Sequence, residues 1–286
     1  MFYFILYKIG RVLALILPIK VGYWLACRWA DLCYSLSKRS RKLLKDNLRV
    51  AMGVDQGKAE DFVRGAFRNF GKYLVDFFRF SKIDTEFIKK FVKVEGRENL
   101  DRALAKNRGV IITSAHLGNW ELGAVVTSLL GYPVNVIALA HENKRVNDFF
   151  IRQRSRKGIG VIPVEGAVKK SFNTLARKQI VCFMADRDFS KSGIDVEFFG
   201  KLAQVPSGGA AFSLKSGSPI VPTFMVREPD DTFRLVYERP IEYKLTNNLM
   251  VDLRNITRKC LEVIEGWVKR YPSQWYIFSQ VWKGAD

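Results

Sequence analysis

Residues 114–123 read SAHLGNWELG, and the rest of the chain is best understood by working outward from this stretch. The apolar run at residues 109–113 precedes it and predicts a buried strand. Residues 124–130 follow it and predict a helix whose small residues pack closely against neighbouring elements. His116 and Glu121 are therefore expected where a strand turns into a helix.

The spacing between these two residues favours a particular geometry. Five residues of regular helix rotate the chain by about 500°, so two mid-helix side chains at this spacing would not meet. If His116 precedes the helix and Glu121 stands in its first turn, the carboxylate can reach back to the imidazole. That contact would fix the tautomer of His116 and leave its second nitrogen to accept a proton. The N–H groups at the helix start could also stabilise a developing oxyanion.

A simpler interpretation of the same residues stays open. His116 would then be a hydrogen-bonded turn histidine, and Glu121 a first-turn acid that stabilises the helix dipole.

Length and charge limit the classes of protein to consider. The chain has 286 residues, enough for one large domain with a full core. Its formal charge of +19 and its pI of about 9.9 indicate an anionic partner, such as nucleic acid, anionic lipid or an acidic carrier protein. The four cysteines lack metal or redox spacing, and we interpret them as packing residues of a reduced protein: Cys27, Cys33, Cys182 and Cys260.

The first 49 residues differ in character from the rest. Residues 2–17 are apolar apart from Lys8, Gly10 and Arg11, and this run is shorter than the ~20 residues of a membrane span. A second apolar stretch covers residues 21–36, and residues 38–49 hold six cations against one acid. We expect residues 1–40 to form a helical segment that anchors on an anionic membrane surface, with the main domain at 41–286. The alternative is two ordinary helices packed on that domain.

The remaining apolar runs predict the fold class. Strands are expected at 134–139, 180–185 and 218–224, with 233–237 pairing antiparallel to the last of these; helices are expected at 144–157, 210–215 and 253–270, and throughout 55–91. Residues 196–210 are expected to be an apolar segment that leads into a glycine-bearing loop. This alternation predicts a single α/β domain with a mixed, largely parallel sheet flanked by helices.

Two charged clusters are candidate binding sites. The helix at 144–157 carries Arg152, Arg154 and Arg156, and a solvated helix face is the alternative. Asp186-Arg187-Asp188 follows a predicted buried strand, and open sheets bind ligands at the carboxyl ends of their strands. The alternatives there are a surface turn or a metal site, but no third metal ligand is evident.

The sequence HLGNWE at residues 116–121 resembles the active-site motif of the lysophospholipid acyltransferase superfamily, specifically that of its lipid A biosynthesis lauroyl/myristoyl branch. The RSRKG run at 154–158, ADRD at 185–188 and the tail at 272–276 resemble further blocks of that branch in the same order. The resemblance covers nearly the whole chain and implies a glycerolipid acyltransferase-like fold, with 41–286 as the acyltransferase domain.

The resemblance also implies a reaction. A fatty acyl group would move from a thioester of acyl carrier protein or coenzyme A to a hydroxyl of a lipid or glycolipid, such as a lipid A precursor. His116 and Glu121 would be the catalytic pair, no metal or other cofactor would be needed, and the site would lie at the cytoplasmic face of the inner membrane. The expected substrate-binding residues are Asn119, Arg152, Arg154, Arg156, Asp186, Arg187 and Asp188.

Two other functions stay open at this point. A basic nucleic-acid-binding protein is motivated by charge alone; the chain shows no recognisable binding module, so we expect no nucleic-acid partner. A membrane-bound acyl hydrolase would use the same histidine on water, and only a comparison of products with and without acceptor separates it from a transferase.

Overall fold

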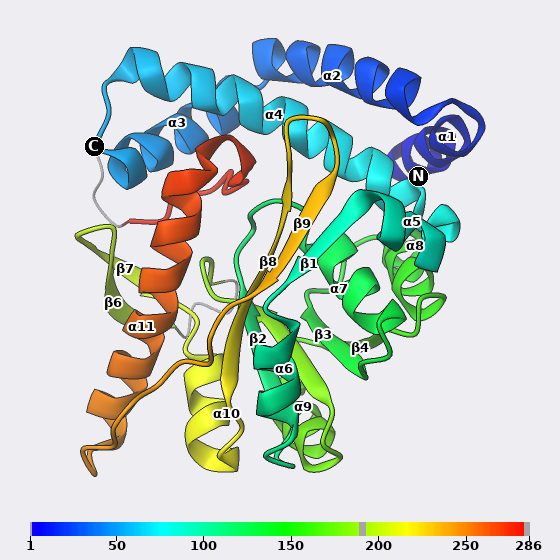
Figure 1. Ribbon diagram of the computed structural model, residues 1–286. Coiled ribbons are helices and arrows are strands. Elements are labelled where there is room, and N and C mark those ends of the chain that lie inside the picture. The colour runs from blue at the N-terminus through cyan, green and yellow to red at the C-terminus, as the bar shows by residue number, and fades with distance from the viewer. Residues whose placement is uncertain (1, 189–192, 283–286) are drawn as a thin grey trace.

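A seven-stranded sheet forms the centre of the molecule in the computed structural model, which describes residues 2–188 and 193–282 (Figure 1). The strands of this sheet are β1 (Val92–Glu95), β2 (Val110–Ser114), β3 (Val134–Ala138), β4 (Gly160–Pro163), β5 (Ile180–Met184), β8 (Ile220–Arg227) and β9 (Phe233–Tyr237). Their order across the sheet is β1-β9-β8-β2-β5-β3-β4.

The directions of the strands confirm the predicted sheet. β8, β2, β5, β3 and β4 run parallel to one another. β9 pairs antiparallel with β8, as expected for residues 233–237, and β1 pairs parallel with β9. The sheet is therefore mixed and largely parallel, and the carboxyl ends of β2 and β5 lie side by side at one edge.

Helices cover both faces of the sheet, and the core accordingly divides into two clusters. One face carries α5 (Thr85–Phe91), α6 (Arg97–Leu104), α7 (Trp120–Leu129) and α8 (Lys144–Ser155); the other carries α9 (Ala167–Ala176), α10 (Gly208–Ser216) and α11 (Leu249–Arg270). In β2, Ile111 packs in the second cluster and Ile112 in the first. A strand buried on both faces is apolar along its length, which explains the run at 109–113.

Four helices at the start of the chain lie across the top of Figure 1, where the parallel strands end. They are α1 (Phe2–Ile16), α2 (Ile19–Leu36), α3 (Lys38–Met52) and α4 (Gln56–Phe78), and the first three pack on α4. In the part of the chain that the structure describes, none of the helices has both the length and the apolar character required to cross a membrane.

The structure departs from the predicted elements in three places. The helical stretch at 55–91 is interrupted after Phe78, because the carboxylate of Asp84 accepts the N–H of Phe87 at 2.8 Å and starts a new helix, α5. Residues 194–205 form an antiparallel hairpin, β6 (Ile194–Phe198) and β7 (Lys201–Val205), a pairing that was not predicted for the apolar segment that begins at residue 196. β4 and α9 were not predicted.

Candidate active site

The loop that carries His116 connects β2 to α7 and is tied to two distant segments. The N–H of Gly118 donates to the Gln274 carbonyl at 2.8 Å, and the N–H of Tyr276 donates to the His116 carbonyl at 2.8 Å. Gly118 has a φ of +66°, and a Cβ at this position would lie 2.0 Å from the Met225 carbonyl oxygen. The turn therefore requires glycine.

The carboxylate that holds the imidazole belongs to Asp186. Oδ1 of Asp186 lies 2.8 Å from Nδ1 of His116. Because an ionised carboxylate only accepts hydrogen bonds, Nδ1 carries the proton and Nε2 is the nitrogen with the lone pair. The sequence analysis expected Glu121 in this role, and the structure corrects that expectation, because Asp186 lies against the imidazole and Glu121 pairs with Arg154. A contact of Asp186 with substrate stays a prediction.

Asp186 is itself held rigidly. Its Oδ2 accepts the backbone N–H of His116 at 2.8 Å and the indole N–H of Trp275 at 3.0 Å. The Asp186 side chain is fully buried, whereas that of His116 is 17% exposed. Trp275 was missed as a site residue, because 89 residues separate it from Asp186 and no local pattern connects the two.

Glu121 forms a buried ion pair with Arg154 instead. Oε2 of Glu121 accepts from Nε of Arg154 at 2.9 Å, and Oε1 accepts from Nη2. Burial disfavours the charge on Arg154, but the nearby carboxylate and its hydrogen bonds outweigh this effect and raise the pKa of the guanidinium. Arg154 therefore does not belong to a solvated helix face, which was the alternative interpretation of the arginines at 144–157.

A cavity of about 530 Å³ contains the candidate site. At the edge of the sheet it is lined by polar residues: His116, Glu121, Arg154, Arg187 and Asp188. Deeper in, its lining is mostly apolar, with Ile112, Val136, Cys182, Met184, Met225 and Leu235. Its size falls within the ~300–1,000 Å³ of small-molecule sites.

The register of the sheet explains the apolar lining. Ile112 of β2 and Val136 of β3 both pair with Cys182 of β5, so the three side chains lie on one face of the sheet. That face is the one covered by α7. Burial raises the pKa of the Cys182 thiol to about 12, so this cysteine stays protonated and is a poor nucleophile.

The other predicted site residues are divided between the cavity and its surroundings. Arg187 and Asp188 line the cavity, and burial lowers the pKa of Arg187. Asn119 is buried, and its side chain caps α7 by accepting the Leu122 N–H at 3.0 Å. Arg152 on α8 and Arg156 directly after it are exposed, and neither is among the residues that line the cavity.

A larger hollow of about 1350 Å³ lies at the opposite edge of the sheet, beside the first residues of β8. It is lined by residues such as Arg102, Lys106, Arg239 and Lys244, and it contains none of the predicted site residues.

An oriented histidine beside a largely apolar cavity is typical of enzymes that use a histidine base on a substrate with an apolar portion. The chain belongs to the family described as Bacterial lipid A biosynthesis acyltransferase, whose profile matches residues 1–284. The protein is therefore an acyltransferase, and the family predicted from residues 116–121 is confirmed.

Several named relatives align along most of the chain. It is 24% identical to a phosphatidylinositol mannoside acyltransferase of Mycolicibacterium smegmatis over 87% of this chain and 82% of that protein. It is 26% identical to a lipid A biosynthesis palmitoleoyltransferase of Escherichia coli over 91% of this chain and 84% of that protein. A phosphatidylinositol mannoside acyltransferase of Mycobacterium tuberculosis is 24% identical, over 84% and 76% of the two chains.

Proposed function

We propose that this protein transfers a fatty acyl group from an acyl thioester to a hydroxyl of a lipid or glycolipid. The observation that carries the proposal is the contact of 2.8 Å between His116 and Asp186 at the edge of a cavity with an apolar interior. The names of the relatives support the acceptor class, because they specify lipid A biosynthesis in one case and phosphatidylinositol mannoside in the other.

The chemistry follows from the tautomer of His116. Nε2 removes the proton from the acceptor hydroxyl, and the oxygen attacks the thioester carbonyl. The C–O bond forms, the C–S bond breaks, and the imidazolium returns its proton to the departing thiolate. Asp186 stabilises the imidazolium during this exchange.

The surroundings of the histidine would assist the same step. The start of α7 lies four residues after His116, and its N–H groups favour negative charge on a carbonyl oxygen. The apolar interior of the cavity would hold the acyl chain. The Glu121–Arg154 pair lines the same cavity and would contact the polar part of a substrate.

The donor is an acyl thioester of acyl carrier protein or of coenzyme A. A formal charge of +19 favours association with either an acidic carrier protein or the phosphates of coenzyme A. Arg187 lies at the edge of the cavity and is a candidate contact for the donor.

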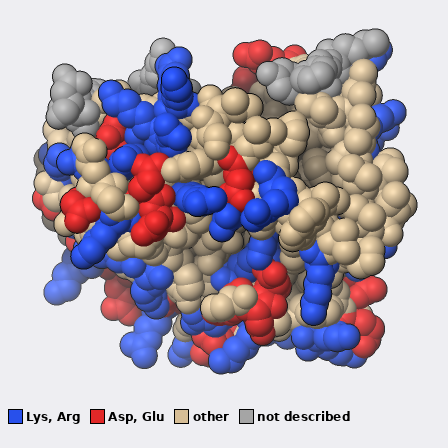
Figure 2. Space-filling view, turned by 90° about the horizontal axis from the view of Figure 1, so that it is seen from above, with Lys and Arg blue, Asp and Glu red and all other residues tan. Residues whose placement is uncertain are grey.

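We also propose that α1 and α2 lie on the membrane, at its cytoplasmic face. On α2 the exposed apolar residues Val21, Trp24, Leu25, Trp29, Leu32 and Leu36 recur at helical spacing and form one outer face. Seen from above, uncharged surface is broadest on the side where α1 and the N-terminus lie, and basic side chains are abundant elsewhere (Figure 2). An apolar face with tryptophans beside cations is typical of attachment to an anionic leaflet.

The proposed reaction is tested with the purified full-length chain. Dodecanoyl-CoA and dodecanoyl-acyl carrier protein are each offered with a lipid A precursor or a phosphatidylinositol mannoside in mixed micelles, and lipids are analysed by mass spectrometry. We expect one acceptor to gain the mass of one acyl group. Release of free fatty acid at the same rate without any acceptor would contradict transfer and identify a hydrolase.

A further inference from the structure

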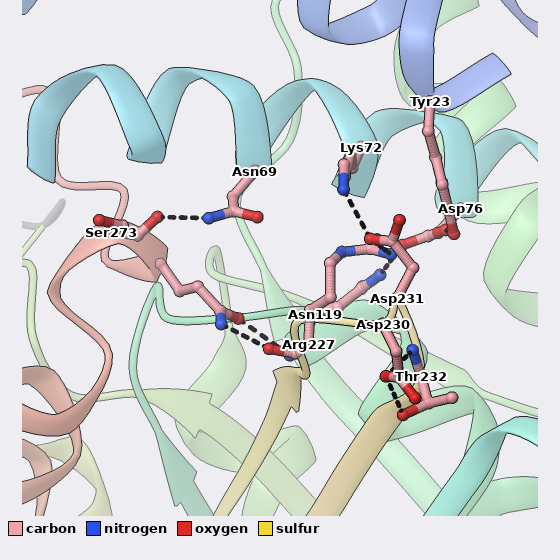
Figure 3. Close-up of polar contacts among 11 residues, drawn as sticks. Tyr23, Asn69, Lys72, Asp76, Asn119, Arg227, Asp230, Asp231, Thr232 and Ser273 are labelled. Carbon is pink, nitrogen blue, oxygen red and sulfur yellow. Dashed lines mark hydrogen bonds and ion pairs between the residues drawn. The ribbon is translucent and has the colours of Figure 1, made fainter. Parts of the chain in front are cut away.

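Asp76, in the last turn of α4, is a buried carboxylate held by three segments of the chain (Figure 3). Its Oδ1 accepts the hydroxyl of Tyr23, on α2, at 2.5 Å. Its Oδ2 accepts the amide N–H of Asn119, in the loop of His116, at 2.7 Å, and also an N–H of Arg227 at the end of β8. Asp76 thus joins α2, the catalytic loop and the central sheet.

Arg227 connects this carboxylate to the C-terminal segment that also holds the loop. Its backbone N–H donates to Oε1 of Gln274 at 2.9 Å, and Nε2 of Gln274 donates to the Arg227 carbonyl at 2.7 Å. The Gln274 carbonyl in turn accepts the N–H of Gly118 at 2.8 Å. A shift of the Asp76–Arg227 pair would therefore move the loop at two points.

Asn119 is the more direct connection to the histidine. Its backbone N–H donates to the Met225 carbonyl at 2.7 Å, its Oδ1 caps α7, and its Nδ2 reaches Asp76. Only Leu117 and Gly118 lie between it and His116, and Gly118 is packed closely against Met225. The position of His116 therefore depends on the contact between Asn119 and Asp76.

Tyr23 extends the same network toward the surface. It is 5% exposed, whereas the next residue, Trp24, is 61% exposed on the outer apolar face of α2. The Arg227 guanidinium also lies 4.6 Å from the centre of the Tyr23 ring. Consecutive residues of α2 thus belong to the buried network and to the surface that we assign to the membrane.

A buried ion pair adds little net stability, because the cost of removing both charges from water offsets their attraction. What the Asp76–Arg227 pair does supply is fixed geometry between three segments that are far apart in sequence.

We propose that Asp76 is a positioning residue for acyl transfer: it fixes the His116 loop through Asn119 and, through Tyr23, couples that loop to the contact of α2 with lipid. This inference rests on the function proposed above. It adds that the catalytic rate depends on whether α2 is in contact with lipid.

The first test is Asn119→Ser. Serine still caps α7, but its side chain is too short to reach Asp76. We expect kcat to fall about 10- to 100-fold with KM for the thioester unchanged, because the loop is displaced while the cavity is intact. The control is Asn99→Ser, which removes another buried amide whose Nδ2 donates to the Tyr237 carbonyl at 2.9 Å, away from the site. A purely structural role would lower stability in both variants and kcat per folded molecule in neither.

The second test is Tyr23→Phe, which removes only the hydroxyl that reaches Asp76. Thiol release from butanoyl-CoA, a water-soluble donor, is measured with the acceptor identified in the transfer assay present throughout, with and without vesicles of phosphatidylcholine and phosphatidylglycerol in equal amounts. We expect vesicles to raise the wild-type kcat several-fold, and the variant to bind vesicles equally but to lose this increase. Tyr132→Phe, which removes a hydroxyl bonded to Asp101 at 2.5 Å outside the site, should behave as wild type.

Three results would overturn the inference alone: a wild-type kcat in Asn119→Ser, an equal response of Tyr23→Phe to vesicles, or no response of the wild type. A wild-type protein that consumes no acyl thioester, with or without acceptor, would overturn the proposed function and this inference with it.

Discussion

Asp186 and His116 are 70 residues apart in sequence, yet their side chains meet at 2.8 Å. They meet because β2 and β5 are adjacent parallel strands whose last residues, Ser114 and Met184, are register partners. The contact assigns to Asp186 the orienting role that local spacing had assigned to Glu121.

Asp186→Asn should abolish most of the activity while the fold survives. The two N–H groups that Oδ2 accepts, from His116 and Trp275, require an oxygen at that position. The amide would then present its NH₂ group to Nδ1, which forces the proton onto Nε2 and gives the wrong tautomer. We expect kcat to fall by roughly 100- to 10,000-fold in a thiol-release assay.

The matched control for this substitution is Asp252→Asn. Asp252 is a buried carboxylate that accepts the backbone N–H and the hydroxyl of Thr246, outside the site. Equal activity loss in the two variants would show that Asp186 acts only through folding.

The Glu121–Arg154 pair should be sensitive to removal of one partner. Arg154→Ala leaves the Glu121 carboxylate buried and uncompensated, and we expect the free energy of unfolding to fall by about 3–5 kcal/mol. Glu121→Gln combined with Arg154→Met should restore stability in urea unfolding but leave activity low, because the polar contacts of the cavity are gone. Arg152→Ala, on the exposed face of α8, should change stability by less than about 0.5 kcal/mol. A double variant with full activity would exclude a substrate contact.

Attachment to lipid should depend on the outer face of α2. Trp24→Lys with Trp29→Lys should reduce co-sedimentation with phosphatidylglycerol-containing vesicles, although both changes add positive charge. The control is Leu249→Lys with Met250→Lys at the start of α11, where the side chains are 60% and 59% exposed, compared with 61% and 63% for the tryptophans. Equal binding by both double variants and the wild type would contradict the proposed orientation.

The packing of α2 on α4 should weaken in acid. Asp31 of α2 accepts hydrogen bonds from Arg68 of α4 and pairs with Arg64 and Arg28, and these groups, Arg68 foremost, hold the pKa of Asp31 below its ordinary value of 3.8. A depressed pKa means that the contribution of Asp31 to stability is complete above pH 3.8 and is lost as pH falls through the lower value in the folded protein.

The comparison of wild type with Asp31→Asn in urea unfolding checks this expectation. The difference in unfolding free energy should be constant above pH 3.8 and should shrink below it. A difference that stays the same in strong acid would exclude the ionised carboxylate as its source.

Local patterns were enough to predict the central strands of the sheet and the motif around His116, because β2, β5 and β8 are buried strands with continuous apolar runs. They were not enough to identify the partner of His116, since that contact depends on which strands are neighbours. The role of Asp76 could not be predicted for a related reason. It lies among Tyr73, Phe77 and Phe78, whose helical spacing predicts only a face that packs in the core. The boundary at residue 40 between an N-terminal segment and the main domain stays a prediction. The hydrogen bond between Tyr23 and Asp76 joins the two sides of that boundary.

The measurement that tests the account most directly is acyl transfer by His116→Ala, followed together with intact-protein mass spectrometry of the wild type during turnover. We predict a loss of about 100- to 10,000-fold in transfer rate, as for removal of a general base. We also predict no acyl adduct on the protein, because the acceptor attacks the thioester directly and Cys182 stays protonated. A full rate in His116→Ala, or an acyl group trapped on a serine or cysteine of the chain, would contradict the mechanism.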